Sequence, residues 1–88
     1  MKHRIISHKQ TGFNRMLVEV LLEGETEGEK KAIEATVNYE ASEEQLQYVD
    51  WYVRNRVDLG PYTIAEIQDM RNNRWYLKVE KQTSIQNP

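Results

Sequence analysis

The chain has 88 residues, of which 39% are hydrophobic, 30% are charged and none is cysteine, and its formal net charge is -2. This composition predicts a folded chain, because disorder requires lower hydrophobicity or a much larger net charge. It excludes a disulfide scaffold and thiolate metal sites, and no apolar stretch reaches the roughly 20 residues of a membrane-spanning helix. We expect one small domain over residues 1–82, a frayed tail at 83–88, a cytoplasmic location and no membrane partner.

The first half of the chain predicts three strands. Residues 3–9 and 16–23 have strand-like patterns and are separated by a turn at Gly12. In residues 31–40 apolar and polar positions alternate, which is the period of a half-buried strand, so residues 23–31 would form a hairpin loop before it. The inward positions of that third strand would be Ile33, Ala35, Val37 and Tyr39.

Residues 42–56 carry the clearest signals of a helix. Ser42 is a good N-cap, and Gln45 occupies the third helical position, as a capping box requires. Pro61 prevents the helix from continuing much further. At 100° per residue, one stripe should pack on the sheet, and it consists of Leu46, Val49, Val53 and Val57.

The last third of the chain predicts two more strands. Residues 62–70 are ambiguous, because Thr63 with Glu66 would suit a capping box, but the short span before the next element favours a hairpin strand. Residues 74–80 alternate in the manner of a half-buried strand. The predicted fold is α+β, in the order β-β-β-α-β-β, with one helix across an antiparallel sheet.

Two sets of apolar residues exceed what this fold needs for its core. Tyr48, Trp51 and Tyr52 lie on the side of the helix that its aliphatic stripe does not use. Leu17 and Leu21 fall on the supposedly wet face of the second strand. The aromatic rings of the helix either cover the core while half-buried or anchor an interface, where Tyr, Trp and Arg are enriched.

These surpluses predict a non-enzymatic protein-binding module, a small adaptor or inhibitor that occludes a partner's surface or pairs as a homodimer. Charge is segregated along the chain, since residues 1–15 hold four basic and no acidic residues, and residues 16–44 hold nine acidic residues against two lysines. The acidic block could steer encounter with a basic partner. The predicted interface residues are Tyr48, Trp51, Tyr52, Arg56, Leu17 and Leu21.

The alternative function is binding of single-stranded nucleic acid by a basic and aromatic strand face. No catalytic set, metal site or cofactor is predicted. His3 and His8 are five residues apart, which places them on opposite faces of a regular strand. The acidic loop of residues 23–31 lacks the ligand spacing of a calcium loop. The residues of the alternative nucleic-acid face are Arg71, Arg74, Tyr76 and Lys78.

Overall fold

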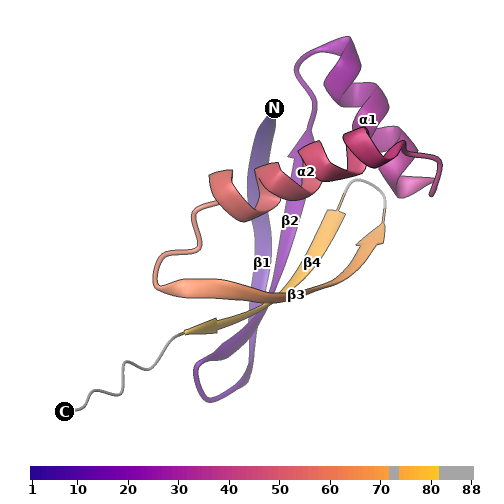
Figure 1. The fold of residues 1–88 in the computed structure, drawn as a ribbon. Coiled ribbons are helices and arrows are strands. Elements are labelled where there is room, and N and C mark those ends of the chain that lie inside the picture. Colours follow the sequence, from indigo (N-terminus) through magenta and orange to yellow (C-terminus); the bar gives the residue numbers. More distant parts are fainter. Residues whose placement is uncertain (72–73, 82–88) are drawn as a thin grey trace.

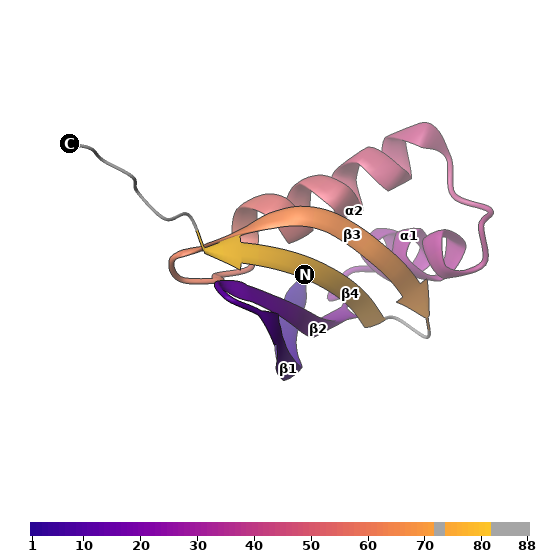
Figure 2. The same ribbon diagram turned by 90° about the horizontal axis from the view of Figure 1, so that it is seen from below.

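The structure is a computed structural model that describes residues 1–71 and 74–81, without the side chains of residues 68–71. Four strands form one antiparallel sheet in the order β1-β2-β4-β3 (Figure 1). Figure 2 shows that both helices lie on the same side of this sheet. The α+β class is therefore confirmed, and the tail predicted at 83–88 lies outside the described residues. The elements are β1 (Lys2–Gly12), β2 (Arg15–Glu23), α1 (Glu27–Val37), α2 (Glu43–Arg56), β3 (Tyr62–Arg71) and β4 (Arg74–Lys81).

The predicted third strand is wrong, because most of residues 31–40 belong to helix α1. Thr26 caps this helix: its hydroxyl accepts from the backbone N–H of Glu29, whose carboxylate accepts in return from the backbone N–H of Thr26. Ala32, Ile33 and Thr36 are buried, which is the spacing of one helical face. The alternation in the sequence was misleading, and the predicted loop at 23–31 contains the helix start instead. The fold thus has two helices, in the order β-β-α-α-β-β.

Helix α1 ends in a turn that normally favours glycine. Tyr39 has a φ of 59°, its backbone N–H donates to the carbonyl of Thr36, and the N–H of Glu40 donates to the carbonyl of Ala35. These two bonds define a Schellman motif, whose left-handed position is occupied here by tyrosine. The Tyr39 ring is 81% exposed. Burial of this side chain therefore contributes little stability to offset the cost of the left-handed backbone conformation.

The other elements were predicted correctly. In α2 the Ser42 hydroxyl accepts from the backbone N–H of Gln45, and the Gln45 side chain accepts from the backbone N–H of Ser42. Residues 62–70, for which a helix was the alternative, form the edge strand β3 and pair with β4. Strands β1, β2 and β4 were also predicted. Capping and strand signals were therefore reliable wherever they agreed with the spacing of apolar residues in the same segment.

The core lies between α2 and one face of the sheet. Val49, Val53 and Val57 of the predicted helical stripe are buried, but Leu46 is 42% exposed and Tyr52 takes a place in the core at 9% exposure. The buried side of α2 is therefore rotated towards Tyr52 relative to the prediction. The other core residues are Val18, Val20, Leu22, Ala32, Ile33, Trp75, Leu77 and Val79.

Strand β1 forms one edge of the sheet and is interrupted by a bulge at Ile6. The register moves from Ile5 opposite Val20 to Ser7 opposite Glu19, so the inward and outward positions exchange after the bulge. His3 and His8 therefore both lie opposite buried positions of β2, which corrects the prediction that they face opposite ways. His8 is exposed, and His3 is half-buried.

Candidate protein-binding surfaces

The exposed side of α2 carries an ordered stack of Tyr48, Trp51 and Arg56, called the aromatic stack below. The Tyr48 and Trp51 rings are 6.4 Å apart between centroids and inclined by 20°, an offset stacked arrangement. The guanidinium carbon of Arg56 lies 5.3 Å from the Trp51 centroid, within range for a cation–π interaction. Trp51 remains 45% exposed and Tyr48 40% exposed. Three of the residues predicted for the interface are thus brought together.

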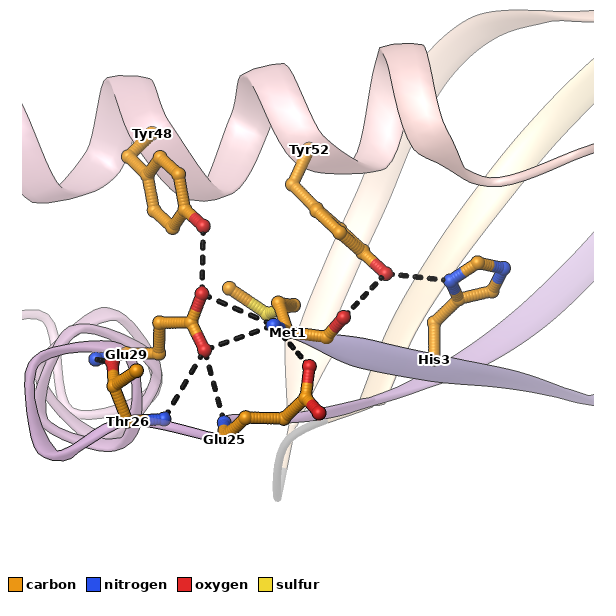
Figure 3. A network of polar contacts seen from close by, with 7 residues as sticks. All are labelled: Met1, His3, Glu25, Thr26, Glu29, Tyr48 and Tyr52. Carbon is orange, nitrogen blue, oxygen red and sulfur yellow. Dashed lines mark hydrogen bonds and ion pairs between the residues drawn. The ribbon is translucent and has the colours of Figure 1, made fainter.

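A carboxylate of helix α1 fixes one end of the aromatic stack. The Tyr48 hydroxyl donates to Glu29 Oε2 at 2.8 Å, as Figure 3 shows. Glu29 also accepts from the Met1 ammonium group, at 2.9 Å on Oε1, and from the backbone N–H of Glu25 at 2.9 Å. The hydrogen bond to Glu29, together with partial burial, raises the pKa of Tyr48. These contacts connect the start of α1, the N-terminal residue and α2.

Tyr52 belongs to the core and not to the aromatic stack. Its hydroxyl donates to the Met1 carbonyl oxygen at 3.1 Å and lies 2.8 Å from His3 Nδ1 (Figure 3). Burial raises the pKa of this tyrosine. Of the aromatic residues predicted as interface anchors, Tyr52 therefore contributes to packing and to the position of β1.

Leu17 and Leu21 lie on the opposite side of the molecule from the aromatic stack. In β2 they alternate with the buried residues Val18, Val20 and Leu22, so they face away from the helices, and both are half-buried. We call this uncovered side of the sheet the open sheet face. The structure therefore divides the predicted interface between two surfaces that point in opposite directions.

Three residues of the predicted nucleic-acid face, Arg74, Tyr76 and Lys78, also lie on the open sheet face, where their side chains contact carboxylates. Glu19 accepts from Arg74 at 3.1 Å and from the Tyr76 hydroxyl at 3.3 Å. Lys78 Nζ lies 3.7 Å from Glu66. Arg71 pairs with Arg74 in the backbone register, but its side chain lies outside the described residues. The three described side chains do share one face, as predicted from their alternation.

Sequence reasoning missed two features of these surfaces. Phe13, at the tip of the β1–β2 hairpin, is 85% exposed, and its place between Gly12 and Asn14 was the available signal, because a turn of this kind rarely buries a side chain. Glu29 was treated as part of a solvated loop. The signal for its role was Thr26 three residues before it, which is the spacing of a capping box.

The charge of Glu29 gives a pH-dependent prediction. The Met1 ammonium, the Glu25 backbone N–H and the Tyr48 hydroxyl lower the pKa of Glu29 from 4.5 to about 2. A carboxyl group with a lowered pKa stabilises the fold above its unfolded pKa, and that contribution is lost as pH falls through the folded pKa. Glu29→Gln keeps a capping side chain but removes the charge, so we expect a lower melting temperature than wild type at pH 7.

The difference in melting temperature between wild type and Glu29→Gln should shrink as pH falls from 4.5 towards about 2, the window set by the two pKa values. Thermal denaturation followed by circular dichroism at several pH values measures it. Glu34→Gln, at an exposed position of the same helix, is the control. A difference that stays constant across this window would show that the Glu29 charge is not coupled to folding.

Comparison with protein-family models, curated proteins and solved structures finds no match for this chain. Across residues 1–71 and 74–81, no group of three or more His, Cys, Asp or Glu side chains is placed to hold a metal ion. None of the helices in this part of the chain is long and apolar enough to cross a membrane. The geometry of the two surfaces is therefore the basis for a functional proposal.

Proposed function

We propose that this chain is a non-enzymatic protein-binding module, a small adaptor or inhibitor that covers part of a partner's surface. The observation that carries the proposal is the aromatic stack. Trp51 lies on the side of α2 opposite the buried Val49 and Val53, and it is ordered between Tyr48 and Arg56 while much of its surface is exposed. Trp, Tyr and Arg are the residues that most often dominate binding energy, and side chains that are already ordered lose less entropy on binding.

Charge around the aromatic stack suggests the chemistry of the partner. Residues 24–61, which hold both helices, contain nine acidic and four basic residues. Glu44 precedes Trp51 by seven residues, so the two share one face of α2. Although Arg56 lies on the Trp51 ring itself, the layer as a whole carries net negative charge, which favours encounter with a basic surface. The absence of cysteine suits a reducing compartment, and we propose the cytoplasm as the place of action.

Replacing Trp51 with alanine tests this function. We expect Trp51→Ala to raise the dissociation constant for the partner at least about 30-fold, equivalent to about 2 kcal/mol, because a central aromatic anchor is lost. The partner would be recovered with the wild-type protein as bait, purified, and titrated against each variant by calorimetry.

Two tyrosines provide a matched control for that experiment. Tyr48→Ala removes a ring of the aromatic stack, whereas Tyr39→Ala removes the same kind of ring, in a more exposed position, from the α1–α2 turn. We expect weaker binding for the first and unchanged binding for the second. A folded Trp51→Ala protein that binds the purified partner as tightly as wild type would refute the proposal.

One observation favours nucleic-acid binding as a second candidate. The basic residues Arg4 and Lys9 of β1 lie opposite Leu21 and Leu17 of β2, so they share the open sheet face with the predicted nucleic-acid residues. Against this, Glu19 and Glu66 already pair with the cations of β4. Fluorescence anisotropy with a labelled single-stranded oligonucleotide tests this second function. Binding to phosphates would weaken steeply with added salt.

A further inference from the structure

The molecule presents two surplus surfaces that point in opposite directions. On the helical side Trp51 and Tyr48 are exposed. On the open sheet face Leu17 and Leu21 are half-buried, and both helices of the described part of the chain lie on the other side of the sheet (Figure 2). A two-fold symmetric dimer buries the same patch of both copies, so it would use one of these surfaces and leave the other uncovered. A contact between the helical side of one copy and the open sheet face of the next would use both.

The two surfaces also carry opposite charge. The helical layer is acidic, as described above for residues 24–61. Among the described side chains, the open sheet face has more basic than acidic residues, because every charged residue that β1 places on this face is basic. The basic residues are Lys2, Arg4, Lys9, Arg15, Arg74 and Lys78, and the acidic residues are Glu19, Glu23, Glu66 and Glu80.

The cations of β1 are the ones available to a partner. Arg15, Arg74 and Lys78 pair with glutamates of the open sheet face itself. Lys2, Arg4 and Lys9 are exposed, and among the described side chains they have no ion-pair partner. Charge complementarity therefore favours an acidic surface as the occupant of this face.

The sheet register arranges apolar and basic side chains in rows. One row runs Arg4, Leu21 and Arg74 across β1, β2 and β4. Another runs Lys9, Leu17 and Lys78 across the same strands. Each row has a leucine at its centre and a cation at either end. A third row of Ser7, Glu19 and Tyr76 lies between them, and Glu19 is hydrogen-bonded within this face by Ser7, Tyr76 and Arg74. The face therefore offers two leucines separated by an internally paired carboxylate, with the unpaired cations of β1 at its edge, and this complements a layer with net negative charge.

We infer that copies of this chain associate head to tail, with the aromatic stack of one copy on the open sheet face of the next. The inference rests on the proposed function and names the partner as a second copy. The Trp51 and Tyr48 rings contact Leu17 and Leu21, which flank Glu19, and acidic residues such as Glu44 face the cations of β1. A stack-to-stack dimer would instead bring two acidic surfaces together. Because each copy keeps one free surface of each kind, association continues beyond the dimer to rings or chains.

Two blocked variants test the inference. Trp51→Ala blocks the helical side, and Arg4→Glu combined with Lys9→Glu blocks the open sheet face. Each blocked variant alone should be monomeric in sedimentation velocity, whereas wild type associates beyond the dimer. An equal mixture of the two should form a one-to-one dimer and nothing larger, since only one pair of intact surfaces remains. The charge-matched control is Lys30→Glu with Lys31→Glu on α1, which should leave wild-type association in place.

The other outcomes overturn the inference in distinguishable ways. A mixture that stays monomeric, or a blocked variant that still associates alone, contradicts the head-to-tail contact. Oligonucleotide binding that is lost in the Arg4→Glu, Lys9→Glu variant, without self-association of wild type, assigns the open sheet face to nucleic acid. A monomeric wild type whose affinity for a foreign protein falls with Trp51→Ala refutes the inference alone. Failure of Trp51→Ala to change any association refutes the proposed function as well.

Discussion

Replacing Leu22 with alanine is expected to lower the free energy of unfolding by about 3 to 5 kcal/mol, because the side chain is fully buried between the sheet and the helices. The same change at the preceding residue, Leu21, should cost about 1 kcal/mol, because that side chain lies on the open sheet face and stays partly hydrated. Urea denaturation of the two variants measures both losses. Since adjacent residues of a strand point to opposite faces, the pair reports how differently the two faces are covered.

Similar losses for Leu21→Ala and Leu22→Ala would contradict a sheet with one covered face. They would mean that a second layer packs against the open sheet face in the folded chain. The contact proposed between copies requires that face to be uncovered in the monomer. Denaturation should therefore be measured at low protein concentration, where association does not add to the apparent stability.

Gly24→Ala should destabilise the protein by about 2 to 3 kcal/mol, in the range expected for overpacking. A Cβ atom at this position would lie 2.6 Å from the backbone nitrogen of Lys30 and 2.9 Å from the carbonyl carbon of Glu29. Both neighbours are backbone atoms of α1, so the strand–helix connection would have to move. Thermal denaturation of the purified variant measures the loss.

Gly28→Ala is the matched control, because this glycine lies in the first turn of the same helix. An added Cβ atom would have only the Thr26 hydroxyl oxygen near it, at 3.9 Å. Alanine in a helix is favoured over glycine by about 0.5 to 1 kcal/mol, so Gly28→Ala should stabilise the protein slightly. Equal effects at the two positions would show that close approach at Gly24 is not what constrains the connection.

Most of the fold was predictable, because its signals are local. Ser42 with Gln45 marked the start of α2, and alternation marked β2 and β4. The error over residues 31–40 arose because apolar residues there, Ile33, Ala35, Val37 and Tyr39, also alternate with polar ones. The capping box at Thr26 and Glu29 pointed to a helix, but it lay in a segment already assigned to a loop. Where a strand-like and a helix-like spacing of apolar residues both fit a segment of about ten residues, a capping box is the better guide to its secondary structure.

The candidate surfaces were less predictable than the elements. A helical wheel placed Tyr48, Trp51 and Tyr52 together, but it could not show how far α2 rolls on the sheet, and that roll puts Tyr52 in the core. The division of the predicted interface between opposite faces follows from strand order and helix placement, which are long-range properties. The grouping of Arg4 and Lys9 with Leu17 and Leu21 depends on the bulge at Ile6, which has no evident signal in the sequence.

The mass of the wild-type protein in solution, measured by size-exclusion chromatography with light scattering over a wide concentration range, tests head-to-tail association most directly. We expect a mass that rises with concentration beyond twice the 10.5 kDa of one chain, and that falls back in high salt because charge attraction is screened. A mass that stays at 10.5 kDa at every concentration, or one that stops at a salt-resistant dimer, would contradict it.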